Sequence, residues 1–144
     1  MLEFAHQEHI KSYYFDSRNQ TFELPPLTQQ EEADVCVIGA GFFGLSAALE
    51  LAEKGKKVIV LEGARVGFGA SGRSGGQAIN GFEEGIDEYI AQMGFDKAKK
   101  LWDMSLEAID IIDERIAKYG IQCDWKKGYA TLALNERRMD DLIE

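Results

Sequence analysis

Three glycines and one acidic residue have the types and the spacing that could hold a nucleotide diphosphate. Gly39, Gly41 and Gly44 form a G-x-G-x-x-G motif, and Glu62 follows farther along the chain. The first glycine permits a tight turn, the second lets the backbone approach a diphosphate, and the third lets a helix pack closely on a sheet. Free N–H groups at the start of that helix would face the phosphates, and Glu62 would accept hydrogen bonds from ribose hydroxyls. The motif therefore predicts a dinucleotide site.

The segments around the motif have the order strand, turn, helix, strand. Val35 to Ile38 is a continuous apolar run, which predicts a parallel strand buried on both faces. A helical stripe follows, Lys54 and Gly55 end the helix, and Val58 to Leu61 is a second β-branched, apolar strand. The stripe consists of Leu45, Ala48, Leu49 and Ala52. The fold class is therefore expected to be α/β, with a Rossmann-like βαβ unit. An ordinary βαβ unit without a nucleotide is the alternative, and the matching flanks favour the nucleotide.

A second glycine-rich segment follows Glu62 directly. It holds five glycines between Gly67 and Gly76, interleaved with Ser71, Arg73 and Ser74. Such a loop offers exposed backbone N–H groups and small hydroxyls, which bind anions. A flexible linker has a similar composition. The position of the loop beside the presumed nucleotide favours anion binding.

Composition limits the classes of function. The chain has 144 residues, of which 45% are hydrophobic and 28% charged, with a net charge of -9. That acidity argues against a nucleic-acid partner and is compatible with an amine substrate. The uncharged run at 35–49 is shorter than the roughly 18 to 20 residues that span a bilayer. Because the first residues show no secretory signal, a cytoplasmic location is expected.

The cysteines and histidines do not suggest a metal or redox site. Cys36 lies in the first strand and Cys123 in a later apolar alternation, and both are expected to be small core residues. His6 and His9 have no further histidine or cysteine nearby. We therefore expect no metal.

Three regions are expected along the chain. Residues 1–32 form an N-terminal arm, which contains an aromatic pair, Tyr13 and Tyr14, expected to dock on the main body. Residues 33–95 form the βαβ unit and the glycine-rich loop. Residues 96–144 lead into a second, substrate domain.

The last region is expected to hold a helix and a hairpin. The apolar spacing predicts a helix over 96–119, whose stripe of large side chains would lie in the core. The alternation of apolar and polar residues predicts two strands, 121–125 and 129–134, that pair as a hairpin. Asn135 would cap a further helix with an apolar side of Met139, Leu142 and Ile143.

These elements cannot cover themselves. Parallel strands are normally buried on both faces, and a two-stranded ribbon alone is marginal. The sequence is therefore expected to be the N-terminal portion of a longer chain, or to be completed by a second polypeptide.

Two motifs together resemble those of the D-amino-acid-oxidase-type FAD-dependent oxidoreductases. They are the segments 34–49 and 60–77, and the discriminating element is the Gly-Ala-Ser-Gly-Arg block at 69–73. The likeness extends to the Ser-Tyr-Tyr stretch of the arm and to 119–125, so it covers nearly the whole chain. Ser74 departs from the asparagine that relatives often have there.

The resemblance implies an FAD site and a role for each matching residue. The motif glycines would contact the pyrophosphate, Glu62 the ribose, and Arg65 would lie near the adenosine. Ser71, Gly72 and Arg73 would lie against the pyrophosphate, and 75–77 would run towards the isoalloxazine ring. The implied cofactor-binding set is Gly39, Gly41, Phe42, Phe43, Gly44, Glu62, Gly63, Arg65, Gly69, Ala70, Ser71, Gly72, Arg73, Gly75, Gly76 and Gln77.

The resemblance also implies oxidation of an amine C–N bond to an imine and then an aldehyde, with oxygen or another acceptor taking the electrons. No residue here has the pattern of an acid, base or nucleophile, so no catalytic side chain is assigned. Three alternatives stay open. The chain could belong to an oxidase or dehydrogenase of the same fold acting on glycine, sarcosine or a D-amino acid. It could instead be a truncated nucleotide-binding module without turnover, or an NAD-binding module.

Overall fold

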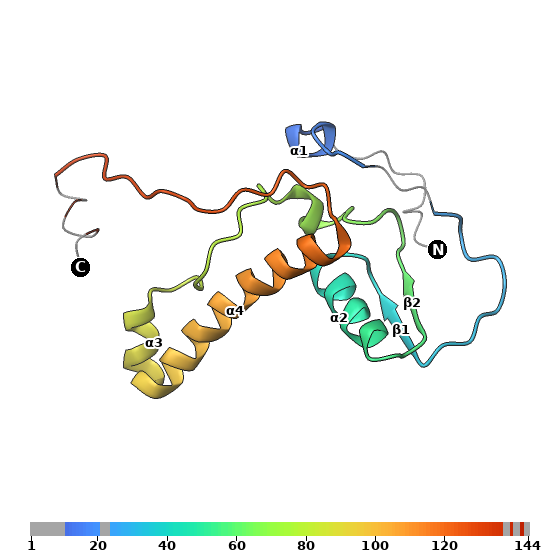
Figure 1. Ribbon diagram of the computed structural model, residues 1–144, viewed down its shortest axis with the longest axis horizontal. Coiled ribbons are helices and arrows are strands. Elements are labelled where there is room, and N and C mark those ends of the chain that lie inside the picture. The colour runs from blue at the N-terminus through green and yellow to red at the C-terminus, as the bar shows by residue number, and fades with distance from the viewer. Residues whose placement is uncertain (1–10, 21–23, 137–138, 140–141, 143–144) are drawn as a thin grey trace.

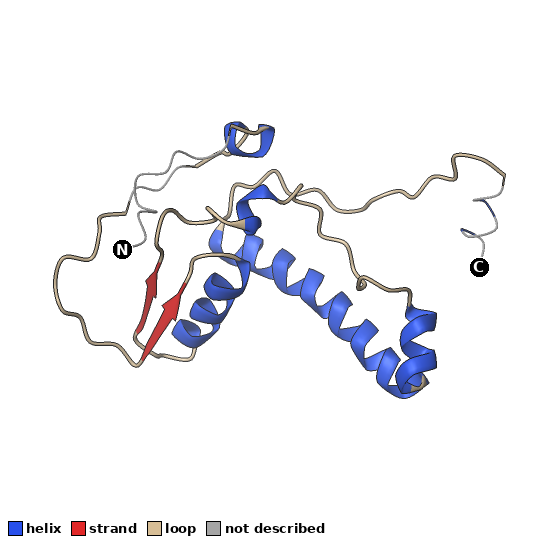
Figure 2. Ribbon diagram, turned by 180° about the vertical axis from the view of Figure 1, so that it is seen from behind, coloured by secondary structure: helices blue, strands red, loops and turns tan. Residues whose placement is uncertain are grey.

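The computed structural model describes residues 11–20, 24–136, 139 and 142 (Figure 1). Its centre is a βαβ unit of β1 (Val35–Ile38), α2 (Phe42–Glu53) and β2 (Val58–Leu61). The two strands are parallel, with Val35 opposite Val58 and Ile38 opposite Leu61. Figure 2 shows the strands side by side with α2 next to them. The element order and bounds predicted from the apolar pattern are confirmed.

Local interactions explain how the chain passes from α2 into β2. Gly55 has a φ of +77°, which favours glycine after a helix. The Asp34 carboxylate then accepts a hydrogen bond of 2.9 Å from the Lys57 backbone N–H. That contact joins the start of β1 to the start of β2 and fixes their register.

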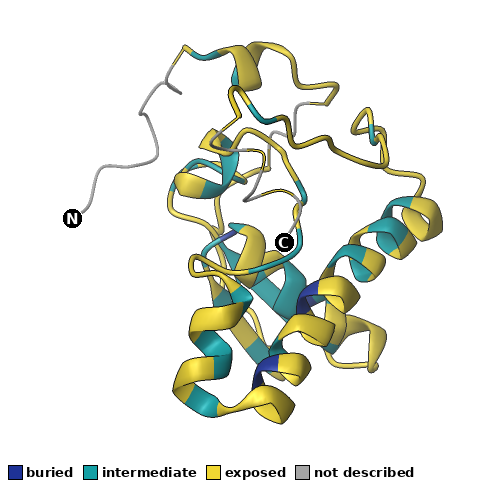
Figure 3. Ribbon diagram, turned by 90° about the vertical axis from the view of Figure 1, so that its left-hand side faces the viewer, coloured by how far each residue is buried: buried dark blue, intermediate teal, exposed yellow. Residues whose placement is uncertain are grey.

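The sheet is covered on one face, not on both. Val35 and Val37 are half-buried, whereas Cys36 is exposed and Ile38 is 88% exposed. Figure 3 shows how little of the described chain is buried. The expectation that this strand is buried on both faces, with Cys36 in the core, is therefore wrong for this structure. The reason is that α2 packs on one face and no described element packs on the other.

Two further helices pack against each other, and only the C-terminal end of the second one reaches α2 of the βαβ unit (Figure 1). They are α3 (Ile86–Met93) and α4 (Phe95–Tyr119), joined at Gly94, which has a φ of +83°. The prediction of α4 is confirmed, and Gly120 ends it in the left-handed conformation. Ala98 is fully buried, but Trp102 stays 37% exposed and Ile112 38%. The apolar stripe of α4 is therefore only partly covered.

Polar contacts hold α4 on α2. The Arg115 guanidinium donates hydrogen bonds of 2.7 Å to the Ser46 hydroxyl and to the Glu50 carboxylate. Near the ends of both helices, Glu53 accepts hydrogen bonds from Lys118 and from the Tyr119 hydroxyl. These contacts fix the angle at which α4 leaves the βαβ unit.

The expected hairpin is absent, because residues 121–134 contain no strand. The segment is held to α4 instead: the Asp113 carboxylate accepts hydrogen bonds from the Trp125 indole (2.9 Å) and from Lys127 (2.6 Å). A two-stranded ribbon is marginal without a surface to pack on, which explains the difference. Cys123 is exposed in this segment, so its expected core position is also wrong. Most of the expected last helix lies outside the described residues, although Met139 and Leu142 are helical.

The arm docks on the main body through a polar contact. Its short helix α1 (Tyr13–Asp16) lies next to the 3-10 turn η1 (Ala70–Arg73). The Asn19 amide donates hydrogen bonds to the Gln122 carbonyl and, at 3.0 Å, to the Asp124 carboxylate. Tyr13 is 79% exposed and Tyr14 47%, so the aromatic pair is not buried against the main body.

Among the described helices, none combines the length and the apolar character needed to cross a membrane. Across all the residues that the structure describes, no group of three or more histidine, cysteine and acidic side chains could hold a metal ion. His6 and His9 lie outside the described residues.

Candidate functional site

The carboxylate of Glu62 links the turn after β1 to the segment after β2. One of its oxygens accepts a hydrogen bond of 2.8 Å from the Ala40 N–H, and the other accepts one of 3.0 Å from the Ala64 N–H. Each carboxylate oxygen has a second acceptor position, so both can still accept a hydrogen bond from a ligand. Glu62 therefore has the position and the spare acceptors predicted for a ribose contact.

The glycines of the first motif are required for steric reasons. Gly39 has a φ of +102°, which disfavours other residues. A Cβ on Gly44 would clash with the Gly39 carbonyl oxygen and would approach Val37 Cγ1 to 3.3 Å. Gly44 thus allows α2 to lie directly against the β1 turn, as the motif predicts.

Ser71 connects the second glycine-rich segment to the start of α2. Its hydroxyl oxygen accepts a hydrogen bond of 3.0 Å from the Phe42 N–H, in the first turn of α2. A Cβ on Gly41 would lie 2.9 Å from the same oxygen. The N–H groups of Phe43 and Gly44 also belong to the first turn and have no acceptor within the helix. The loop and the helix therefore meet where an anion would bind.

A cavity of about 410 Å³ lies between these elements. Six of the residues predicted from the sequence line it, together with Ala64 and Phe68. The six are Gly41, Glu62, Gly63, Gly69, Ala70 and Ser71. The structure thus brings residues from both motifs together around one space.

Other predicted residues support this cavity from outside or lie away from it. A Cβ on Gly72 would clash with the Gly67 carbonyl, so this glycine fixes the shape of the loop. The Arg73 guanidinium donates a hydrogen bond of 3.4 Å to the Phe68 carbonyl and lies over the Phe68 ring, with 5.9 Å between its Cζ and the ring centroid.

The remaining predicted residues do not line the cavity. Phe42 is 67% exposed and Phe43 89%. The residues Arg65, Gly75, Gly76 and Gln77 are also exposed. The structure does not bring these residues to the lining of the cavity.

The sequence reasoning missed the two apolar residues of the lining. Ala64 contributes the second N–H bound to Glu62, and Phe68 contributes the ring beneath Arg73. Ala64 follows Glu62 closely and Phe68 lies inside the glycine-rich segment, and these positions could have indicated that both line the site. An apolar wall is typical of a site that binds an aromatic ring system.

The groups with shifted pKa values lie away from the cavity. Hydrogen bonds from Lys118 and Tyr119 lower the pKa of Glu53, and hydrogen bonds from Lys127 and Trp125 lower the pKa of Asp113. Glu53 pairs α2 with α4, and Asp113 pairs α4 with the segment after it, so these groups do not mark a catalytic acid or base. The cavity is suited to binding and orientation.

The donors and acceptors present fit a dinucleotide. The start of α2 supplies N–H groups and the positive end of a helix dipole for a diphosphate, with no side chain on Gly41 to fill the approach. Glu62 supplies acceptors for ribose hydroxyls, and Phe68 an apolar wall. This set would hold the adenosine diphosphate half of a cofactor.

Comparison with known proteins identifies an FAD-dependent family. The family model described as DAO, FAD dependent oxidoreductase, matches residues 34–144. A probable oxidoreductase OrdL of Haemophilus influenzae is 88% identical over 144 residues, which is 100% of this chain and 33% of that protein. The gamma-glutamylputrescine oxidoreductase of Escherichia coli is 44% identical over 137 residues, 95% of this chain and 32% of that protein.

A probable oxidoreductase OrdL of Rhizobium meliloti is 40% identical over 85 residues, 59% of this chain and 20% of that protein. The chain thus spans about one third of the length of the first two relatives. No solved structure matches the chain.

Proposed function

The chain belongs to the DAO family of FAD-dependent oxidoreductases, and from this premise we propose that it supplies the FAD-binding part of an enzyme that oxidises an amine. FAD is the cofactor of this family. The single observation that supports the assignment most is the cavity in which Gly41, Ser71 and Glu62 meet at the start of α2.

Each of these residues has a distinct role in the proposed complex. The first-turn N–H groups of α2 bind the pyrophosphate, and Ser71 holds the second glycine-rich segment against that turn. Glu62 binds the ribose hydroxyls while its bonds to Ala40 and Ala64 keep the carboxylate in place. The segment 75–77 leads from the pyrophosphate towards the flavin ring, and Arg65 lies near the adenosine.

We assign the reaction to the C–N bond of an amine such as gamma-glutamylputrescine. When bound, FAD accepts two electrons as a hydride from the carbon beside the amine nitrogen. Hydrolysis of the resulting imine would give an aldehyde and release ammonia, and dioxygen would take up the two electrons together with two protons to give hydrogen peroxide. The support for this substrate is the relative of Escherichia coli, a gamma-glutamylputrescine oxidoreductase.

Two other functions compete with this one. A different amine or amino-acid oxidase or dehydrogenase of the same fold would act on glycine, sarcosine or a D-amino acid. A nucleotide-binding module without turnover would bind FAD and release no peroxide. The exposed face of the sheet at Ile38 supports the need for further protein to complete the enzyme.

The first experiment is an absorption spectrum of the full-length protein, taken before and after addition of FAD and desalting. Retained flavin bands are expected. Peroxide release is then measured with gamma-glutamylputrescine, glycine, sarcosine and a D-amino acid. Peroxide from gamma-glutamylputrescine alone supports the proposal, and peroxide from another substrate alone favours the first alternative. Bound flavin without peroxide or flavin reduction for any amine favours the second.

A matched variant separates the binding claim from the substrate claim. Ser71→Ala is expected to weaken FAD retention, whereas Ser74→Ala, in the same segment, is expected to retain FAD. The Ser74 hydroxyl only accepts a local hydrogen bond from Gly76, so it makes a suitable control. Equal retention by both variants would contradict the placement of the pyrophosphate.

A further inference from the structure

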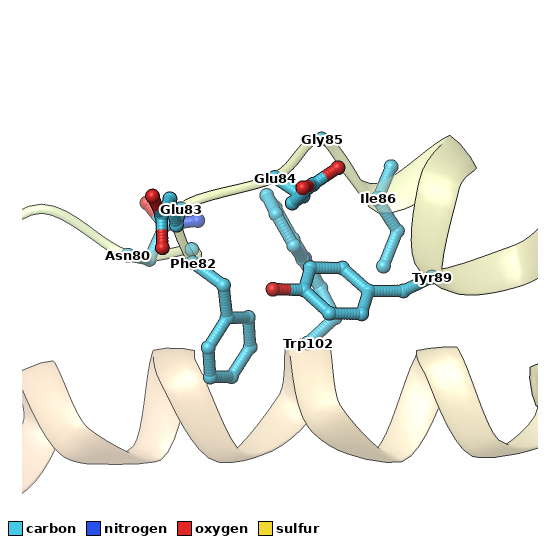
Figure 4. Close-up of a pocket in the computed structure, with 9 residues that line it drawn as sticks. Asn80, Phe82, Glu83, Glu84, Gly85, Ile86, Tyr89 and Trp102 are labelled. Atoms are coloured by element: carbon cyan, nitrogen blue, oxygen red, sulfur yellow. The ribbon is translucent and has the colours of Figure 1, made fainter. Parts of the chain in front are cut away.

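A second cavity lies where the chain leaves the glycine-rich segment and enters α3. It has a volume of about 250 Å³ and lies between the loop at 80–85 and the helices α3 and α4 (Figure 4). Residues 80–86, Tyr89 and Trp102 line it. The function proposed above does not use this cavity.

Three aromatic side chains form the apolar part of the lining. They are Phe82 from the loop, Tyr89 from α3 and Trp102 from α4. The rings of Phe82 and Tyr89 meet edge to face, with 5.6 Å between their centroids. Trp102 lies under the backbone of Gly81, where an added Cβ would be 3.9 Å from its ring. Each ring comes from a different element, so the cavity is formed by the fold and not by one segment.

Two carboxylates complete the lining. Glu83 and Glu84 follow Phe82 directly and are exposed, and Figure 4 shows their side chains on the loop above the rings. Neither carboxylate has a salt bridge or hydrogen bond within the part of the chain that the structure describes. By contrast, Glu50, Glu53 and Asp113 are all paired with a lysine or an arginine.

Unpaired acids beside aromatic faces favour one class of ligand. A cation gains energy over the face of an aromatic ring, and Trp gives the strongest interaction. A carboxylate adds Coulomb attraction at short range, which salt screens. An anion would be repelled, and a neutral apolar ligand would gain nothing from the two carboxylates. The combination therefore favours a cation that also has apolar surface.

We propose that this cavity binds the ammonium group of an aliphatic amine, with the ring of Trp102 against the cation and the carboxylates of Glu83 and Glu84 balancing its charge. The ligand is of the same chemical class as the amine of the proposed reaction. The binding does not depend on FAD, because no residue of this cavity lines the first one.

The test is isothermal titration calorimetry on the full-length protein, with tetramethylammonium chloride as the probe. The neutral isostere 3,3-dimethyl-1-butanol is titrated at the same ionic strength. Saturable binding of the cation without binding of the alcohol is expected. Equal binding of both compounds, or no binding of the cation, overturns the proposal.

Variants assign the binding to this cavity. Two variants are expected to weaken the binding of the cation roughly fivefold or more, the size of a partly desolvated cation–π or charge contact. They are the double variant Glu83→Gln/Glu84→Gln and the single variant Trp102→Leu. Trp102→Phe should retain part of the affinity. The control is Glu107→Gln, an exposed acid of α4 outside the cavity, which should bind as the wild type does. If the double variant is folded and binds the cation with unchanged affinity, the proposal is overturned.

The flavin spectrum of the same samples separates this proposal from the proposed function. Flavin retained without ammonium binding overturns the cavity proposal and leaves the FAD assignment intact. Ammonium binding by protein that retains no flavin supports the cavity proposal while the FAD placement fails.

Discussion

The carboxylate of Glu62, at the end of β2, accepts a hydrogen bond of 2.8 Å from the backbone N–H of Ala40, in the turn after β1. The contact ties the two ends of the parallel strands together beside the first turn of α2. One side chain therefore maintains the shape of the turn and presents acceptors to the cavity.

Glu62→Gln is expected to weaken FAD binding by about 1 to 3 kcal/mol, the typical loss for a charged hydrogen-bond partner. The amide has one acceptor oxygen where the carboxylate has two, so the Ala40 or the Ala64 N–H loses its partner. Equilibrium titration of the deflavinated full-length protein with FAD measures the change. Glu107→Gln, which removes an acid from the exposed side of α4, should bind FAD normally. Equal affinities for both variants would show that the ribose contact is misplaced.

Gly44→Ala is expected to destabilise the fold by about 1 to 3 kcal/mol, the usual loss when a well-packed site is overfilled. The added methyl group would collide with the Gly39 carbonyl and push α2 away from the β1 turn. Urea unfolding measures the effect. Gly85→Ala is the control, because its methyl group would meet open space and its φ is -64°. A stable Gly44→Ala protein with normal FAD affinity would contradict the close approach of helix and turn.

The sequence predicted the parts of the fold that depend on local pattern. The apolar runs gave β1 and β2, the glycine spacing gave the turn between β1 and α2, and the three- and four-residue repeat gave α4. In each case the periodicity or the backbone conformation alone determines the element. Gly85, Gly94 and the repeat of Ile86, Tyr89, Ile90 and Met93 would have predicted α3 by the same reasoning.

The parts that failed depend on contacts between distant segments. The hairpin over 121–134 needs a surface to pack on, and Asp113 instead holds Trp125 and Lys127 of this segment on α4. Core positions for Cys36 and Cys123 require neighbours that the described chain does not supply. In the site, the pairing of Ser71 with Phe42 joins residues far apart in sequence, so the motif order suggested it without fixing its geometry.

Ser71→Ala should lower the free energy of unfolding by about 0.5 to 1.5 kcal/mol, because the Phe42 N–H loses its acceptor. Chemical denaturation of the deflavinated protein measures this loss without a contribution from the cofactor. Ser74→Ala removes a hydroxyl from the same segment and should change stability less, since Gly76 can bind water instead. If the two variants were equally stable, the contact between loop and helix would be absent in solution.

The cluster of Glu53, Lys118 and Tyr119 should make stability depend on pH at both extremes. Hydrogen bonds from Lys118 and then Tyr119 lower the pKa of Glu53 below its ordinary 4.5. The stabilisation of the fold by ionised Glu53 is therefore present above pH 4.5 and is lost as the pH falls through the lowered pKa of Glu53. The bond to Glu53 raises the pKa of Lys118 above 10.5, so that contribution is present below pH 10.5 and is lost as the pH rises through the raised value.

Glu53→Gln should reduce both of these pH dependences, because it removes the charge to which Lys118 is paired. The effect should be small, since the groups are exposed and salt screens them. Thermal unfolding from pH 3 to 11 at low and high salt measures it, and Asp103→Asn, which breaks the 2.6 Å pair with Lys99 within α4, is the control. Because Arg115 also lowers the pKa of Glu53 through its charge, Arg115→Gln should shift the acid limb in the same direction but by less. If Glu53→Gln left the loss of stability at acid pH unchanged, α4 would not be held on α2 by this cluster.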